Sequence, residues 1–207
     1  MAYFPAFIKM EGASVLIVGG GRAAARKIEV LLDFGAKITV IALHPIEKIR
    51  QNQGIHLSQK EFEENDLQGM DVVVAATERK ELNHEIAEAC KLRNIPVNAV
   101  DQIEDCTFIF PSYIKKGNVV TAISSSGKSP VVAQYLKEKF EPFMTEELIA
   151  LTEYLGSLRE MTRNRISTEA LRKAFYQEVL AFGVDEGRSP NEEELEKIYG
   201  RHQIEQE

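Results

Sequence analysis

The stretch Val15–Lys27, VLIVGGGRAAARK, joins a run of aliphatic residues to a run with strong helix propensity through three consecutive glycines. The aliphatic run is typical of a strand buried on both faces of a parallel sheet. Gly19, Gly21 and Ala24 fit the pattern G-x-G-x-x-G/A, in which a tight turn lets the backbone approach a pyrophosphate at a helix N-terminus. The stretch therefore predicts a turn that binds the phosphates of a dinucleotide.

Strand and helix patterns alternate over the first hundred residues. In the helix expected at 22–34, Ile28, Leu31 and Leu32 have helical spacing, and Gly35 suits the position after the helix end. Such alternation is typical of βαβ units and predicts a Rossmann-type parallel sheet. The expected strands cover 13–18, 37–42, 55–59, 70–77 and 95–100, and further helices cover 46–51 and 81–94.

The pattern changes after Asp101. Residues 106–127 read as two strands joined by a Lys-Lys-Gly-Asn turn, without the helix that a parallel crossover needs, so this pair is expected to be antiparallel. Ser129 and Pro130 suit the start of a helix over 130–143. Helical spacing then continues over 145–164, 167–183 and 189–201, each segment opening at Thr or Ser with Glu shortly after.

The predicted fold class is therefore α/β: a Rossmann-type parallel sheet, a small antiparallel/α region and a C-terminal helical bundle. The expected domain limits are 1–106, 107–145 and 146–207.

Composition and charge limit the classes of function. The chain has 207 residues, 44% hydrophobic and 28% charged, which is ordinary for a globular domain. It contains no apolar run near the roughly 18–20 residues that cross a bilayer, and its N-terminus does not fit a signal peptide, so we expect a cytoplasmic protein without membrane contact. The net charge of −7 argues against nucleic-acid binding, and the acidic excess lies in residues 146–207.

No metal site is expected from the sequence. Cys90 and Cys106 lack CxxC spacing, and the histidines are scattered without HxxxH or HExxH spacing. The four histidines are His44, His56, His84 and His202.

The second strand bears on the choice of cofactor. It ends at Ala42-Leu43-His44, where an Asp or Glu usually contacts the ribose hydroxyls. No Arg stands there to meet a 2′-phosphate, so the sequence favours NAD over NADP.

Asp101 follows the last predicted strand of the parallel sheet, at the edge where such sheets bind ligands. A carboxylate beside a nicotinamide ring could accept a proton while hydride leaves the neighbouring carbon. The sequence leaves a turn-forming Asp equally open. The loop Ser124–Lys128 could hydrogen-bond an anionic substrate or could simply precede a helix, and it lacks the spacing of an ATP-binding P-loop.

Six segments together resemble the precorrin-2 dehydrogenase family of sirohaem synthesis, including the N-terminal module of the fused sirohaem synthases. The resemblance covers roughly residues 3 to 145. The segments are LIVGGGRAAARK, ITVIA, VVVAAT, PVNAVD, TFIFPS and AISSSGKSPVVAQYLK.

The resemblance implies NAD-dependent oxidation of precorrin-2 to sirohydrochlorin, with Asp101 as the functional aspartate. It implies a homodimer formed through residues 107–145, which agrees with strands whose edges would otherwise be open. In the loop that could bind an anionic substrate, the candidate contacts are Ser124, Ser125 and Lys128. The cofactor positions that the resemblance implies are Gly19, Gly20, Gly21, Arg22, Ala23, Leu43, His44 and Thr77.

Two further questions concern iron and substrate charge. Some family members also insert iron through the same aspartate, whereas others leave that step to a separate chelatase. No His, Cys or carboxylate cluster accompanies Asp101 in the sequence, so we expect little ferrochelatase activity. A carboxylate-rich tetrapyrrole would need basic residues nearby, and the candidates are Arg22, Arg26, Lys115, Lys116 and Lys128. A bifunctional enzyme, a dehydrogenase of another pathway and a non-catalytic dinucleotide sensor stay open as alternatives.

Overall fold

The computed structural model describes residues 3–202. The chain divides into two compact units at the junction of Phe110 and Pro111. The three-part division expected from the sequence, with limits at 106 and 145, stays a prediction.

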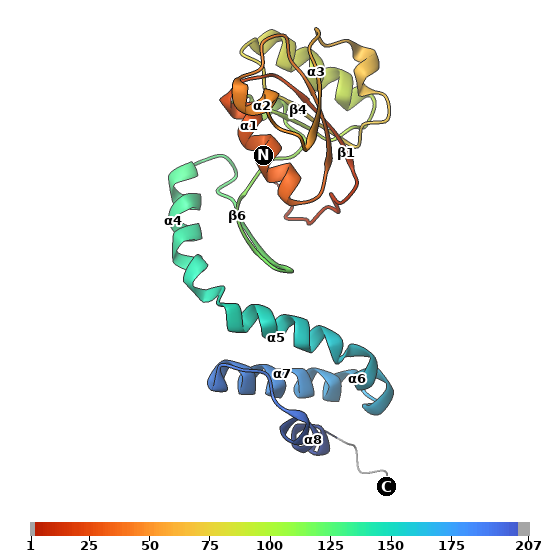
Figure 1. The fold of residues 1–207 in the computed structure, drawn as a ribbon, viewed down its shortest axis with the longest axis vertical. Helices are drawn as coiled ribbons and strands as arrows, with labels where there is room; N and C mark the ends of the chain where they lie inside the picture. The colour runs from red at the N-terminus through yellow and green to blue at the C-terminus, as the bar shows by residue number, and fades with distance from the viewer. Residues whose placement is uncertain (1–2, 203–207) are drawn as a thin grey trace. The chain divides into compact units, whose positions relative to one another are not determined.

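The first unit is built on a five-stranded sheet in the order β3-β2-β1-β4-β5 (Figure 1). Every neighbouring pair in it is parallel. The order reverses between β1 and β4, because the chain builds outward from β1 to β3 and then returns to the other side of β1. The strands are β1 Ser14–Val18, β2 Lys37–Ile41, β3 Ile55–Ser58, β4 Val72–Ala75 and β5 Val97–Ala99.

Helices cover both faces of this sheet. Successive side chains of a strand point to opposite faces, and in β1 Val15 and Ile17 pack with α1 whereas Leu16 and Val18 pack with α3. This arrangement confirms the predicted Rossmann-type α/β architecture. The helical elements are α1 Arg22–Asp33, α2 Glu47–Arg50 and α3 Lys80–Leu92, with the 3-10 turns η1 Glu64–Leu67 and η2 Ile103–Asp105.

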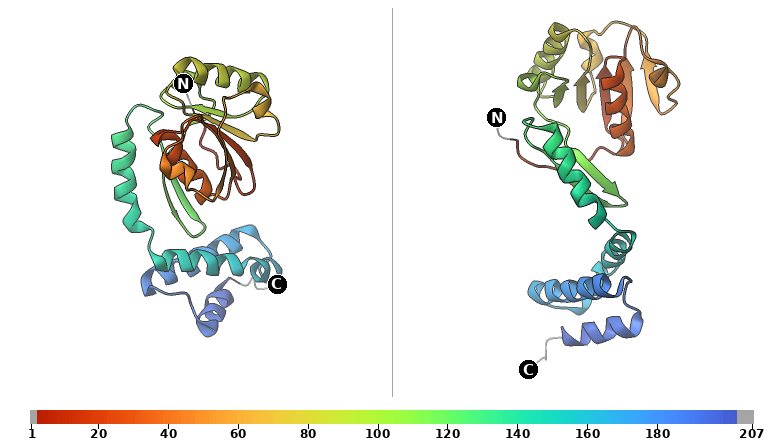
Figure 2. Two further views of the ribbon diagram at one scale, coloured as in Figure 1. Left: turned by 45° about the horizontal axis from the view of Figure 1, so that its top comes forward. Right: turned by 90° about the vertical axis from the view of Figure 1, so that its left-hand side faces the viewer.

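The second unit begins with the antiparallel hairpin predicted from the sequence. β6 Ser112–Lys116 pairs with β7 Val119–Ile123, and Gly117, with φ of 53°, forms the turn. α4 Pro130–Phe140 packs on β6 (Figure 2). The Ser129 side chain caps this helix by accepting a hydrogen bond from the Val132 N–H at 3.3 Å. The 3-10 turn η3 Glu141–Phe143 follows.

The remaining helices are α5 Glu146–Ser157, α6 Arg159–Arg165, α7 Glu169–Glu186 and α8 Glu192–Arg201, packed around a core that includes Phe175 and Val179. Two expectations were wrong in detail. The helix predicted over 145–164 is interrupted after Ser157, whose hydroxyl donates to the Tyr154 carbonyl at 2.7 Å and competes with helical bonding. The last helix starts after Asn191 and not at Ser189, because Asn191 and Glu194 form a capping box.

Candidate functional site

A cleft of about 690 Å³ lies at the carboxyl edge of the parallel sheet, where the strand order reverses. Open α/β sheets bind ligands at this position. Every cofactor or catalytic residue predicted for the first unit lines this one cleft: Gly19, Gly20, Gly21, Arg22, Ala23, Leu43, His44, Thr77 and Asp101.

The first two glycines are required by the packing of the turn itself. Gly19 has φ of +134°, and a Cβ there would lie 2.2 Å from the Ala76 carbonyl oxygen. A Cβ on Gly20 would lie 2.7 Å from Pro45 Cα. The backbone at these two positions therefore leaves no room for any side chain.

Gly21 differs from its neighbours because a Cβ there would meet nothing within 4 Å. It is the N-cap of α1 and offers no side-chain bond to the helix, and in the described chain the first turn of α1 carries no acidic residue. The space in front of this helix end is thus open. The N–H groups of the first helical turn point into it, and so does the positive end of the helix dipole. These features fit the pyrophosphate of a dinucleotide.

Thr77, at the end of β4, is fixed by Asn83 of α3. The Thr77 hydroxyl and N–H donate to Asn83 Oδ1 at 2.7 and 3.1 Å, and Asn83 Nδ2 donates to the Thr77 carbonyl at 3.1 Å. Asn83 is 2% exposed and also lines the cleft. Sequence reasoning missed this residue, although a signal existed: Asn83 shares helical spacing with the apolar residues Ile86 and Cys90.

Asp101 is exposed at the cleft and has φ of 60°, in the left-handed region. Outside glycine this conformation is uncommon, and Asp is among the residues that adopt it most readily. The Val100 N–H donates to the Ala75 carbonyl at 2.9 Å, which ties the chain just before Asp101 to the end of β4. The backbone geometry therefore fixes the position of the Asp101 Cα atom and the direction of its Cα–Cβ bond.

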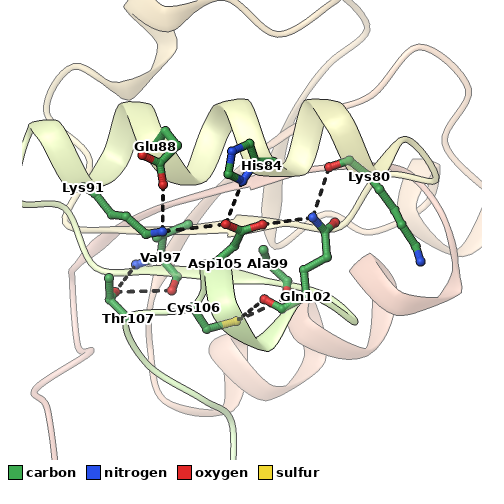
Figure 3. Close-up of polar contacts among 10 residues, drawn as sticks. All are labelled: Lys80, His84, Glu88, Lys91, Val97, Ala99, Gln102, Asp105, Cys106 and Thr107. Atoms are coloured by element: carbon green, nitrogen blue, oxygen red, sulfur yellow. Dashed lines mark hydrogen bonds and ion pairs between the residues drawn. The ribbon is translucent and has the colours of Figure 1, made fainter. Parts of the chain in front are cut away.

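Between α3 and the turn that contains Asp105, the structure assembles a polar cluster that the sequence did not reveal (Figure 3). His84 Nδ1 lies 2.8 Å from Asp105 Oδ1, and Lys91 Nζ lies 2.8 Å from Glu88 Oε1 and 3.7 Å from Asp105 Oδ1. α3 thus brings His84 and Glu88 to the turn that contains Asp105, although the three lie apart in the sequence; the expectation of little ferrochelatase activity stays a prediction.

Ligand atoms of His84, Glu88 and Asp105 lie within 4.8 Å of one another, a spacing that could hold a metal ion. The Lys91 ammonium already pairs with both carboxylates. These bonds raise the pKa of Lys91, mainly through the hydrogen bond to Glu88. We therefore interpret the cluster as an ion-pair network, and the absence of a resident metal stays a prediction.

Lys27 of α1 is a second feature that the sequence analysis did not single out. Its Nζ lies 3.8 Å from the centroid of the Phe110 ring. Burial, followed by the charge of Arg26, lowers the pKa of Lys27 to about 8, and the charges of Cys106 and Asp101 oppose this shift. Lys27 therefore lies within electrostatic range of Asp101.

The predicted substrate residues Ser124, Ser125 and Lys128 lie in the second unit, in the loop between β7 and α4. Ser125 Oγ accepts from the Ser129 N–H at 2.9 Å and donates to the Ser129 carbonyl at 2.9 Å, and Ser124 Oγ accepts from the Ser126 N–H at 3.0 Å. These hydroxyls thus shape the loop, while Lys128 is exposed. Their contact with substrate stays a prediction.

Two other basic residues, Lys116 and Arg22, were candidates for contact with substrate carboxylates. Lys116 Nζ donates to the Met144 carbonyl at 2.8 Å, so this amine is engaged within the second unit. Arg22 lines the cleft.

α4 and η3 carry a stripe of exposed apolar side chains along one side of the second unit. The spacing of these residues is helical, and contiguous apolar surface of this kind marks interaction sites. The stripe consists of Val131, Val132, Tyr135, Leu136, Phe140 and Phe143. Among residues 3–202, no helix has the length and apolar character needed to span a membrane.

Comparison with known proteins agrees with this geometry. Residues 6–112 match the protein family described as "Putative NAD(P)-binding". The siroheme synthase of Photorhabdus laumondii is 37% identical over 86% of this chain and 38% of its own length. Siroheme synthase 3 of Aeromonas hydrophila is 38% identical over 87% of this chain and 39% of its own length. The chain therefore spans about two fifths of these relatives.

One solved structure has a similar fold over nearly the whole chain. It is titled as SirC, a precorrin-2 dehydrogenase, and it superposes with a TM-score of 0.70 over 97% of this chain and 98% of its own. At 22% sequence identity the likeness shows a shared fold, including the hairpin and the C-terminal helices.

Proposed function

Since the chain belongs to the NAD(P)-binding family that its residues 6–112 match, we propose that it is an NAD-dependent dehydrogenase that oxidises precorrin-2 to sirohydrochlorin in sirohaem synthesis. The observation that carries the proposal is the convergence of the glycine turn and Asp101 on one cleft of dinucleotide size. The siroheme synthase relatives and the shared fold of a precorrin-2 dehydrogenase support the choice of substrate.

The glycine turn and the start of α1 would hold the dinucleotide. The open space at Gly21 would admit the pyrophosphate to the N–H groups of the helix end, and Leu43 and His44 would line the ribose side of the cleft. Thr77, fixed by Asn83, would line the cleft at the end of β4, across from the end of β2. When bound, NAD⁺ supplies the acceptor for a hydride.

Asp101 would act as the proton acceptor. The oxidation removes one hydride and one proton from the reduced macrocycle, which together account for the two electrons and two hydrogens lost. A carboxylate at the end of β5, exposed to the cleft, can take the proton while the hydride leaves the neighbouring carbon.

Residues of the second unit would supply substrate contacts and a dimer interface. Ser124, Ser125 and Lys128 would bind carboxylates of the tetrapyrrole through their hydroxyls and ammonium group. The apolar stripe on α4 would pack against a second copy of the chain, giving a homodimer through the hairpin region. We place the protein in the cytoplasm, without nucleic-acid or membrane partners, and assign iron insertion to a separate chelatase.

The direct test mixes the purified protein with NAD and precorrin-2 under anaerobic conditions and follows the absorbance of sirohydrochlorin. The proposal predicts NAD-dependent product formation with one NADH per sirohydrochlorin. NAD binding without product would favour a dinucleotide sensor. Chelation is tested separately by supplying purified sirohydrochlorin and Fe²⁺, where no acceleration over the uncatalysed rate is expected.

A further inference from the structure

We propose that Asp105 is a positioning residue that holds the strained turn carrying Asp101 against α3. The inference rests on the proposed function, since it assigns a role in aiming the proton acceptor. Asp105 itself is buried and does not line the cleft, so it acts through the backbone of the turn and not on a ligand.

The turn needs external support because of the conformation of Asp101. A non-glycine residue in the left-handed region is disfavoured and persists only where the surroundings enforce it. Asp101 has this conformation, with φ of 60°. Within the turn, the Gln102 N–H donates to the Ala99 carbonyl at a long 3.3 Å, which is a weak bond for holding such a conformation.

Asp105 supplies the missing support through both of its carboxylate oxygens. Oδ1 lies 2.8 Å from His84 Nδ1, and Oδ2 accepts from Gln102 Nε2 at 3.0 Å. The same Gln102 nitrogen donates to the Lys80 carbonyl at 3.1 Å, at the start of α3. Gln102, the residue that follows Asp101, is thereby tied to α3 both directly and through Asp105 (Figure 3).

α3 is a rigid support for these bonds. Its opposite side packs into the core through Ile86, Ala87 and Cys90, all fully buried. Asp105 therefore holds the turn in place by bonding it to a helix that is itself fixed in the core.

Cys106 provides a reporter for the same turn. Its Sγ lies 3.2 Å from the Ala99 carbonyl oxygen and 3.3 Å from that of Gln102, so the thiol bridges the two residues that flank Val100 and Asp101. Burial is the main cause that raises the pKa of Cys106 above its ordinary value, which lowers the reactivity of this half-buried thiol while the turn is closed. If the turn opens, the thiol is released to solvent and reagents can reach it.

The experiment compares Asp105→Ala, Asp105→Asn and Glu88→Gln in the full-length protein. Glu88→Gln is the matched control, because Glu88 belongs to the same cluster but bonds only Lys91 there and leaves the turn intact. Each variant is measured for kcat, for the KM and Kd of NAD, and for the rate at which a thiol reagent labels Cys106, with the labelled peptide identified by mass spectrometry to separate it from Cys90.

We expect Asp105→Ala to lower kcat by about 10- to 100-fold, the cost typical of a small misplacement of a catalytic group, while the Kd of NAD is unchanged. Cys106 should be labelled faster than in Asp105→Asn, which removes the same charge from beside the thiol but keeps hydrogen-bonding groups for the turn. Asp105→Asn keeps an amide oxygen that can accept from Gln102 and an amide nitrogen that can bond His84. It should therefore recover part of kcat and part of the protection of Cys106 from the thiol reagent. Glu88→Gln should match the wild type in every measurement.

The inference would be overturned by an Asp105→Ala enzyme whose kcat is unchanged while Asp101→Asn is inactive, a result that leaves the proposed function standing. Loss of kcat without faster labelling of Cys106 would also overturn it. If Asp101→Asn retains full turnover, the proposed acid–base role fails, and labelling of Cys106 still decides whether Asp105 holds the turn. Should Asp105→Ala fail to fold, Gln102→Ala breaks the same link and carries the same expectations.

Discussion

The side-chain amide of Asn83 is bonded to the backbone and hydroxyl of Thr77 through both its oxygen and its nitrogen. This double link fixes the end of β4 to the start of α3 at the wall of the cleft. Asn83→Leu, which keeps the volume but removes every bond, should lower the free energy of unfolding by about 1–3 kcal/mol because buried groups of Thr77 lose their partner.

The same variant should weaken NAD binding, since Thr77 lines the cleft. Denaturant unfolding and NAD titration check the two effects. Exposed Glu85→Gln, on the same helix, is the control. Equal stability and affinity in Asn83→Leu would contradict the account.

Gly19 and Gly21 should respond differently to substitution. Gly21→Ala should fold with wild-type stability, because its Cβ meets open space, yet bind NAD more weakly because that space receives the pyrophosphate. Gly21→Asp should abolish binding by adding a negative charge there. Gly19→Ala should fail to fold or be strongly destabilised, since its Cβ would overlap the Ala76 carbonyl. Circular dichroism melts and NAD titration separate the two classes, and wild-type NAD affinity in a folded Gly21→Asp would refute the placement.

Lys27 should make stability depend on pH in the alkaline range. Its pKa is about 8 in the folded protein and 10.5 in the reference state, so the unfolded chain binds more protons between these values and wild-type stability rises with pH there. Lys27→Met should therefore stabilise the protein most below pH 8, with a gain that shrinks as the pH rises toward 10.5.

Urea unfolding across this pH range, with exposed Lys9→Met as the control, measures the effect of Lys27. A difference between wild type and Lys27→Met that is independent of pH would show that the burial of the ammonium carries no penalty.

The apolar stripe on α4 should determine the oligomeric state. Val131→Glu together with Tyr135→Glu should convert the dimer to a monomer without unfolding the second unit, because both side chains are exposed in the single chain. Sedimentation equilibrium measures the mass. Gln134→Lys, exposed on the same helix and away from the stripe, should stay dimeric. A wild-type protein that is monomeric at all concentrations would remove the proposed interface.

The parallel sheet and the cleft could be predicted because each depends on local pattern: apolar strands, a glycine turn and the residue that follows β5. Asn83, Asp105 and Lys27 were missed because their importance arises from packing between segments far apart in sequence. Asp105 bonds to His84 only because η2 lies against α3. Lys27 is buried because Phe110 lies beside α1. The break after Ser157 likewise depends on a single side-chain bond that competes with a helical pattern.

Turnover of Asp101→Asn with precorrin-2 and NAD tests the central claim most directly. Asn tolerates the left-handed backbone at this position and removes only the proton acceptor. The account predicts a folded variant with wild-type affinity for NAD and a kcat lowered by about 10²- to 10⁴-fold, the range that general acid–base groups supply. A kcat lowered by less than about tenfold, in a variant that binds NAD normally, would contradict the assignment of Asp101 as the group that takes the proton.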